Sequence, residues 1–192
     1  MANKKVYIIH RWGGNSNERW LVWLGNQLKT IGYEVTIPDM PNSETPKIEE
    51  WVGYLQKLIP TPDENTFLVG HSVGCQAIIR YLEKLENIKV GGAVFVAGWF
   101  NLTGLESNKE KEIAKPWIET PINFEKVKSA ASNFMAILSD NDPYVPLSET
   151  KKIFEEKLGA KVVIEKNKGH FTEGDDVFEL PEVVRSIEKL AK

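Results

Sequence analysis

Short apolar runs alternate along this sequence with longer amphipathic segments. Six runs are rich in β-branched and aromatic residues, and they cover residues 6–9, 33–37, 66–69, 92–97, 134–138 and 161–164. Runs of this length and composition are typical of strands that are buried on both faces of a sheet. Between the runs, apolar residues recur three and four positions apart, as at Trp20, Trp23 and Leu24. This is the spacing of a helix with one buried face.

The alternation predicts the α/β class. Consecutive βα units with right-handed crossovers build a parallel sheet that is covered on both sides. We therefore expect a three-layer sandwich, in which a parallel six-stranded sheet has helices on both faces. Pro46 and Pro181 can each occupy the first turn of a helix, and Gly32 and Gly159 suit helix ends.

The domain organisation is expected to be simple. The chain has 192 residues and contains no internal repeat, low-complexity tract or Gly/Ser linker, so we expect residues 1–192 to form a single domain. Residues 98–132 differ from the rest because they are polar and mixed in charge. We interpret them as an excursion over the edge of the sheet at which the strands end.

Composition excludes several classes of partner. A net charge of −3 provides no basic face, so nucleic acid is not expected as a partner. No apolar run approaches the roughly 18 to 20 residues that cross a bilayer, and residues 1–5 lead into a strand without the apolar core of a signal peptide. We therefore expect a cytoplasmic protein with no membrane partner. The single cysteine, Cys75, agrees with a reducing compartment, and nothing specifies a protein partner.

A candidate nucleophile follows the third apolar run. Residues 70–74 have the sequence Gly-His-Ser-Val-Gly, and apolar residues at helical spacing come directly after them. In a G-x-S-x-G turn between a strand and a helix, the serine is exposed on a strained bend, and the small flanking residues let the two elements approach closely. This context predicts Ser72 as a nucleophile. The alternative is a tight turn with a structural serine.

The base is found by elimination, since the chain has three histidines. His10 ends the first strand, and the side chain of His71 should diverge from its neighbour Ser72, which favours a packed or supporting role for it. His170 follows the last strand. Because parallel strands end at one edge of a sheet, His170 can reach Ser72. A base must come within about 2.6 to 3.2 Å of the hydroxyl.

Two carboxylates compete for the role of the acid. Asp140 and Asp142 both follow the fifth strand, and Asp142 lies between Asn141 and two prolines that stiffen the chain, Pro143 and Pro146. We therefore predict Asp142 as the acid and Asp140 as a solvated or turn-capping residue. The chain order nucleophile, acid, base is the order of α/β hydrolases rather than of other serine-triad folds.

With this constellation, the sequence resembles the small serine hydrolases of the retinoblastoma-binding protein 9 type in the α/β-hydrolase superfamily. The likeness extends over nearly the whole chain and rests on these segments: Val6-Tyr7-Ile8-Ile9-His10 with Trp20, Pro38-Asp39-Met40-Pro41-Asn42, Gly70-His71-Ser72-Val73-Gly74-Cys75, Asp142-Pro143-Tyr144-Val145-Pro146 and Gly169-His170-Phe171. The resemblance implies a reduced hydrolase core without the usual first two strands, a mechanism without a metal, and a triad of Ser72, Asp142 and His170.

The oxyanion hole is where this sequence departs from the family. Related hydrolases usually have His-Gly after the first strand, whereas this chain has Arg11 in place of the glycine. The resemblance assigns one oxyanion donor to the backbone N–H of Trp12, and the residue after the nucleophile, Val73, supplies the other. Trp12 and Trp99 both follow strands at this edge and could line an apolar acyl pocket.

Other conspicuous residues have structural interpretations. Trp20, Trp23 and Trp51 are at helical positions typical of the core, and Cys75 is interpreted as a small buried apolar residue. Asp175 and Asp176 have no metal-ligand pattern and are expected in a solvated loop.

The residues together predict a serine hydrolase that cleaves an acyl ester, thioester or amide bond of a small substrate through an acyl-serine intermediate. The triad does not distinguish a carboxylesterase-like from an aminopeptidase-like enzyme, and it needs no cofactor. The alternative is a non-catalytic binding module that keeps the α/β-hydrolase fold.

Overall fold

The sheet of the computed structural model, which describes residues 4–192, is parallel and has the strand order β2-β1-β3-β4-β5-β6. All neighbouring pairs are parallel. Its strands are β1 (Lys5–Ile9), β2 (Glu34–Thr36), β3 (Thr66–His71), β4 (Gly92–Val96), β5 (Phe134–Ser139) and β6 (Lys161–Glu165). The predicted class and the six strands are confirmed. The central strands β3, β4 and β5 are buried along their whole length, as expected of strands with helices on both sides.

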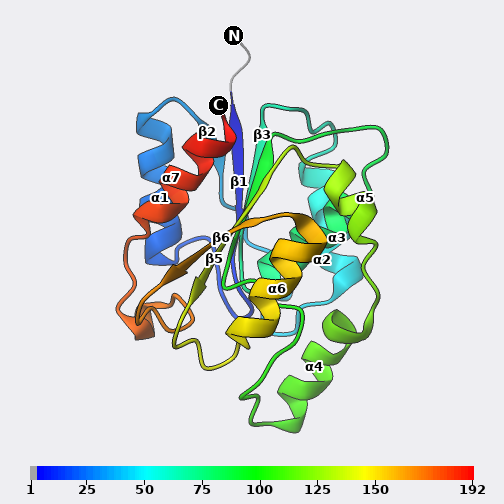
Figure 1. Cartoon of the computed structure of the whole chain (residues 1–192), viewed down its shortest axis with the longest axis vertical. Helices are drawn as coiled ribbons and strands as arrows, with labels where there is room; N and C mark the ends of the chain where they lie inside the picture. The colour runs from blue at the N-terminus through cyan, green and yellow to red at the C-terminus, as the bar shows by residue number, and fades with distance from the viewer. Residues whose placement is uncertain (1–3) are drawn as a thin grey trace.

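Helices cover both faces of the sheet (Figure 1). One face is packed by α1 (Arg19–Thr30) and α7 (Pro181–Leu190). The other is packed by α2 (Ile48–Leu58), α3 (Val73–Glu83), α5 (Phe124–Ser129) and α6 (Leu147–Leu158). The sheet thus separates two apolar cores, and the predicted three-layer sandwich is confirmed.

The predicted helix boundaries hold with one exception. Pro181 is the first residue of α7, and Gly159 ends α6 in the left-handed conformation with φ of 65°. Gly32 also has a positive φ, just after α1. Pro46 is not in the first turn of α2, because that helix begins at Ile48 after Lys47. Pro46 still restricts the backbone, but it does so one residue before the N-cap, Lys47.

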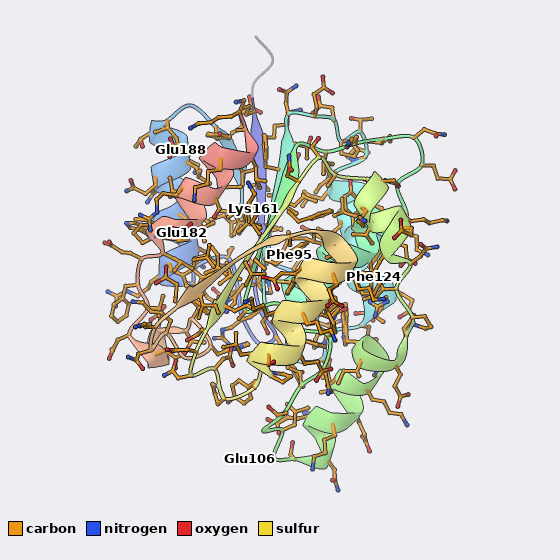
Figure 2. The ribbon with its side chains drawn as sticks, viewed as in Figure 1. Phe95, Glu106, Phe124, Lys161, Glu182 and Glu188 are labelled. Atoms are coloured by element: carbon orange, nitrogen blue, oxygen red, sulfur yellow. The ribbon has the colours of Figure 1, made fainter. Side chains whose placement is uncertain are left out.

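The polar segment 98–132 is more ordered than an excursion suggests. It contains α4 (Asn108–Glu119) and α5, which the polar composition concealed. A capping box opens α4, because Ser107 and Glu110 each bind the other's backbone N–H. Trp117 buries its ring beneath the helix and donates to the carbonyl of Pro46, 2.9 Å away. The helix α4 lies beyond the ends of the strands, and Glu106 lies just before its N-cap residue (Figure 2).

Aromatic side chains organise the core on the α3 and α6 side. Phe95, at the centre of the sheet (Figure 2), stacks on Phe154 of α6, whose ring also meets Phe100. Trp20 and Trp51 are buried as predicted, whereas Trp23 is only partly buried at the edge of the other core. None of the helices within residues 4–192 combines the length and apolar character that a membrane span requires.

Candidate active site

The serine at the end of β3 lies on a sharp bend. Ser72 has φ of 53° and ψ of −118°, a conformation that is costly for a residue with a side chain. Its backbone N–H donates to the carbonyl of Val96 at 2.9 Å, so the neighbouring strand holds the bend in place. Ser72 is 6% exposed, and α3 begins at the next residue. A strand, a strained serine and a helix thus follow one another in the order that a nucleophile elbow requires.

Both glycines of the motif are required by close approaches of the backbone. A Cβ atom on Gly70 would lie 2.7 Å from the backbone nitrogen of Cys75. A Cβ atom on Gly74 would lie 2.5 Å from the carbonyl oxygen of Ile9 in β1. Helix α3 can therefore sit directly against the ends of β1 and β3 only because these two positions lack side chains.

The histidine after β6 reaches the serine. His170 Nε2 lies 2.9 Å from Ser72 Oγ, and the imidazole is largely buried. This distance is within the range for proton transfer from a hydroxyl to a base. Of the three histidines, the one chosen by elimination from the sequence is thus the one whose ring lies beside Ser72.

Asp142 completes the chain of hydrogen bonds. Its Oδ2 atom lies 2.8 Å from His170 Nδ1, and its Oδ1 atom accepts from the backbone N–H groups of Tyr144 and Val145. Asp140 does not contact the histidine; its exposed carboxylate accepts from the backbone N–H of Asn167 at 2.8 Å. The structure thus brings Ser72, His170 and Asp142 together and leaves Asp140 outside, in a turn-capping position.

The loop that carries the histidine is bound to the end of β5 by three successive residues. Ser139, Asp140 and Asn141 accept, through their side-chain oxygens, from the backbone N–H groups of Lys168, Asn167 and Gly169 respectively, at 2.8 to 3.0 Å. The loops that carry Asp142 and His170 are therefore fixed to each other. Ser139 and Asn141 could not be recognised from the sequence, because their partners come from a distant loop.

Asp175 folds the same loop from the other side. Its Oδ2 atom accepts from the backbone N–H groups of His170 and Thr172 and from the hydroxyl of Thr172, at 2.7 to 3.0 Å. The expectation that Asp175 is merely solvated is wrong, although Asp176 is exposed. A carboxylate that accepts from backbone N–H groups can organise a short loop, and the sequence offered this signal at Thr172 and Asp175.

His71 is hydrogen-bonded to the backbone of His170. Its ring is fully buried, and Nε2 lies 2.8 Å from the carbonyl oxygen of His170, so this nitrogen must carry the proton and donate. Its Nδ1 atom lies 3.8 Å from Oε2 of Glu18. The other carboxylate oxygen of Glu18, Oε1, forms an ion pair with Nε of Arg11 at 2.8 Å. Arg11 also donates to the carbonyl of Trp12 at 3.0 Å. The arginine that replaces the family's glycine thus links the loop after β1, through Glu18, to the histidine that contacts His170.

His10 is fixed as a neutral ring. Its Nδ1 atom donates to the carbonyl of Arg11 at 2.8 Å, and its Nε2 atom accepts from the backbone N–H of Met40 at 2.9 Å. A protonated ring could not accept at Nε2. Burial lowers the pKa of His10 and of His71 below the ordinary value of a histidine.

These two histidines predict a pH-dependent stability. When the chain unfolds, each regains a pKa near 6.5, so below that pH the unfolded state binds more protons than the folded state and stability falls as the pH falls. Each histidine can lower the free energy of unfolding by up to about 1.4 kcal/mol per pH unit below about 6.5. Urea unfolding at pH 5.5, 6.5 and 7.5 measures this slope. His10→Asn should reduce it, and a protein that became more stable on acidification through this range would contradict the assignment.

A cleft opens at Ser72 and His170. Its volume is about 380 Å³, and its wall is formed by Arg11, Trp12, Gly13, Glu44, Ser72, Trp99, Leu102, Leu105, Glu110, Tyr144 and His170. Trp12 and Trp99 both line it, as predicted for a substrate pocket. The pocket is not simply apolar, however, because Arg11, Glu44 and Glu110 bring charge to its wall. Segment 98–132 supplies part of this wall through Leu102, Leu105 and Glu110.

Two backbone N–H groups are candidates for binding an oxyanion. Val73 is the first residue of α3, so its N–H has no partner inside the helix. Trp12 is held on both sides, because its indole donates to the carbonyl of Glu44 at 3.0 Å and its carbonyl accepts from Arg11. Within residues 4–192, neither backbone N–H donates to a backbone carbonyl. Val73 follows Ser72 directly, and Trp12 lines the same cleft as Ser72.

The thiol of Cys75 is buried and, unlike Ser72, does not line the cleft. It is fully buried next to Val96, and burial raises the pKa of Cys75 well above its ordinary value. A thiol in this state is a poor nucleophile. In residues 4–192, no three His, Cys, Asp or Glu side chains are grouped so that they could hold a metal ion.

The fold and the elbow define the class of protein: a serine between a parallel strand and a helix, with an aspartate and a histidine from later loops, is the arrangement of α/β hydrolases. The model of the serine hydrolase family matches residues 6–189, and this chain belongs to that family. It is therefore a hydrolase, and the predicted resemblance is confirmed.

Individual relatives agree with this membership. The putative hydrolase YdeN of Bacillus subtilis is 33% identical over 179 residues, covering 93% of this chain and 91% of the relative. The serine hydrolase RBBP9 of Rattus norvegicus is 27% identical over 186 residues, covering 96% of this chain and 95% of the relative. The crystal structure of the ydeN product of B. subtilis superposes with a TM-score of 0.89 at 31% identity, covering 98% of both chains.

Proposed function

We propose that this hydrolase cleaves an acyl ester, thioester or amide bond of a small substrate through an acyl-serine intermediate, with Ser72 as nucleophile, His170 as base and Asp142 as the acid that orients the base. One observation carries the proposal. A continuous chain of hydrogen bonds, 2.9 and 2.8 Å long, begins at Ser72 Oγ in the wall of the cleft and runs through both ring nitrogens of His170 to Asp142. A serine hydroxyl is a weak nucleophile unless a base lies within this reach.

In the first half of the reaction, His170 Nε2 takes the hydroxyl proton as Ser72 Oγ attacks the substrate carbonyl. The carboxylate of Asp142 stabilises the imidazolium that forms, and His170 then gives the proton to the leaving group. In the second half, a water molecule repeats the attack on the acyl-serine. This sequence of steps needs no cofactor.

The oxyanion that develops in each step would be bound by the backbone N–H groups of Val73 and Trp12. A preorganised donor of this kind contributes about 3 to 4 kcal/mol to lowering the barrier. The bonds from Arg11 and Trp12 to the surrounding loop keep the second donor in place before substrate binds. The donor is a backbone group, so it depends on the shape of the loop rather than on the indole.

The cleft favours a small acyl group. Its aromatic and aliphatic wall, which includes Trp12, Leu102 and Tyr144, suits an apolar acyl chain, and a volume of about 380 Å³ limits its size. The charged wall residues Glu44 and Glu110 would act on the rest of the substrate. We place this activity in the cytoplasm, where the single cysteine would remain reduced.

Labelling with a fluorophosphonate tests the proposal. The probe phosphonylates only an activated serine, so we expect one modified peptide, which contains Ser72, and no modification in Ser72→Ala. Ser186→Ala, which removes a fully buried hydroxyl on α7 away from the cleft, should still be labelled. Absence of labelling in a folded wild-type protein would favour the non-catalytic binding module. If the protein is labelled, a screen of acetyl esters, thioesters and aminoacyl amides identifies the bond that it cleaves.

A further inference from the structure

Trp99 approaches the reacting oxygen as well as the substrate. The residue follows β4, is 2% exposed and lines the cleft. Its indole Nε1 donates a hydrogen bond to Ser72 Oγ over 3.3 Å. Ser72 Oγ therefore has two nitrogen neighbours: His170, which can accept its proton, and Trp99, which can only donate.

We propose that Trp99 is a catalytic residue, whose indole N–H stabilises negative charge on Ser72 Oγ when the acyl-serine bond breaks. This inference rests on the proposed function. It goes beyond the triad and the backbone oxyanion donors because those groups act on the proton and on the substrate carbonyl oxygen. Trp99 acts on the serine oxygen itself.

The step in which the indole acts is the departure of the serine. Water adds to the acyl carbonyl carbon and gives a proton to His170. The bond between that carbon and Oγ then breaks, the electron pair remains on Oγ, and the proton on His170 Nε2 passes to Oγ. The indole proton is not transferred at any stage, so the reaction remains an ordinary hydrolysis.

The hydrogen bond from Trp99 should be stronger during this departure than before it. An ester oxygen is a weak acceptor, whereas an oxygen that is becoming an alkoxide is a strong one. Only interactions that strengthen toward the transition state accelerate a step. In acylation the same bond already exists to the free hydroxyl, so its additional contribution there is smaller. A distance of 3.3 Å leaves room for the bond to tighten.

The structure holds the indole in place from its backbone. Gln76, fully buried on α3 one turn after the serine, donates from its side-chain amide to the carbonyl of Trp99. Just before the tryptophan, Ala97 has a φ of 46°, and a Cβ atom on Gly98 would lie 2.8 Å from Phe154. These constraints fix the path of the chain into Trp99. We therefore assign Gln76 as a positioning residue for the indole.

Trp99→Phe tests the role of the N–H, because it keeps an aromatic ring and removes the donor. After acetylation of Ser72 by p-nitrophenyl acetate, mass spectrometry follows the decay of the acetyl-enzyme. We expect this decay to slow by about 10- to 100-fold, the range for losing a hydrogen bond to a charged group. Phosphonylation by the fluorophosphonate, which reports attack by Ser72, should slow by less than about threefold. Trp23→Phe, outside the cleft, should change neither rate.

Gln76→Met provides the second arm, since it fills similar space without the amide. We expect slower decay of the acetyl-enzyme, by about threefold to tenfold, and no further slowing when Gln76→Met is added to Trp99→Phe. Should Trp99→Phe fail to fold, Gln76→Met alone decides the question.

The outcomes separate this inference from the proposed function. Unchanged decay in both variants, or an equal loss in decay and in phosphonylation, would overturn the role of Trp99 while Ser72 remained the nucleophile. A wild-type protein that neither accepts the acetyl group nor reacts with the fluorophosphonate would overturn the proposed function and this inference with it.

Discussion

Asp142→Asn is expected to lower the turnover number on a small acyl ester by about 10⁴-fold while the protein remains folded. An asparagine oxygen can still accept from the N–H groups of Tyr144 and Val145, which now bond to Oδ1 of the aspartate. Its amide nitrogen would then face His170 Nδ1, where Oδ2 lies at 2.8 Å. A donor in this place favours the tautomer with the proton on Nε2, and that nitrogen could no longer accept the proton of Ser72.

Asp140→Asn is the matched control. The two aspartates are separated by one residue, and both substitutions remove one charge from the same loop. Asp140 accepts from the N–H of Asn167, and the oxygen of an asparagine can do the same. We expect its turnover number to change by less than about tenfold. Steady-state kinetics of both variants decide which aspartate is the acid, and circular dichroism verifies that both variants fold. A larger loss of turnover in Asp140→Asn than in Asp142→Asn would assign the role to Asp140.

The alternation of apolar runs was sufficient to predict the architecture, because each βα unit has one energetically favourable way to join a parallel sheet. The two helices within residues 98–132 were not predicted. Their polar composition and Pro116, which lies inside α4, both suggest irregular structure. The sequence did contain a signal for α4, since Ser107 and Glu110 have the spacing of a capping box.

Three residues of the candidate site, Ser72, Asp142 and His170, could be predicted from their order in the chain and by elimination. The chain has three histidines and, after the fifth strand, two candidate aspartates, which left few choices, and the structure brings the chosen three side chains together. The residues that hold them were not predictable. Asn141 and Asp175 bind backbone N–H groups of the loop that carries His170, and such contacts depend on how two loops meet in space.

Arg11 shows a further limit of the sequence. As a departure from the family pattern it raised a question about the oxyanion loop, and no local rule supplied an answer. In the structure its guanidinium pairs with Glu18 of the segment that leads into α1, and Gly14 leaves the space for that carboxylate, since a Cβ atom there would lie 2.6 Å from it. Arg11 and Gly14 therefore accommodate the Glu18 carboxylate together, a contact that is visible only in the folded chain.

Gly74→Ala is expected to destabilise the protein by about 3 kcal/mol or more, a large effect for one methyl group. The added carbon would lie 2.5 Å from the carbonyl oxygen of Ile9 and 2.7 Å from that of His10. Both atoms belong to the backbone at the end of β1, where Ile9 is paired with Gly70 of β3 and cannot move aside alone. Helix α3 must shift instead, and Ser72 would shift with it. Urea unfolding measures the loss of stability.

Gly53→Ala separates this clash from the general effect of adding a methyl group to a helical glycine. Gly53 lies within α2, and no atom lies within 4 Å of the position that its Cβ would take. Alanine restricts the unfolded chain more than glycine does, so this variant should be more stable than the wild type by up to about 1 kcal/mol. The rate of fluorophosphonate labelling should be unchanged in Gly53→Ala and greatly reduced in any Gly74→Ala protein that still folds. Equal stability of the two variants would show that α3 can move away from β1 at little cost, and that the elbow does not depend on this contact.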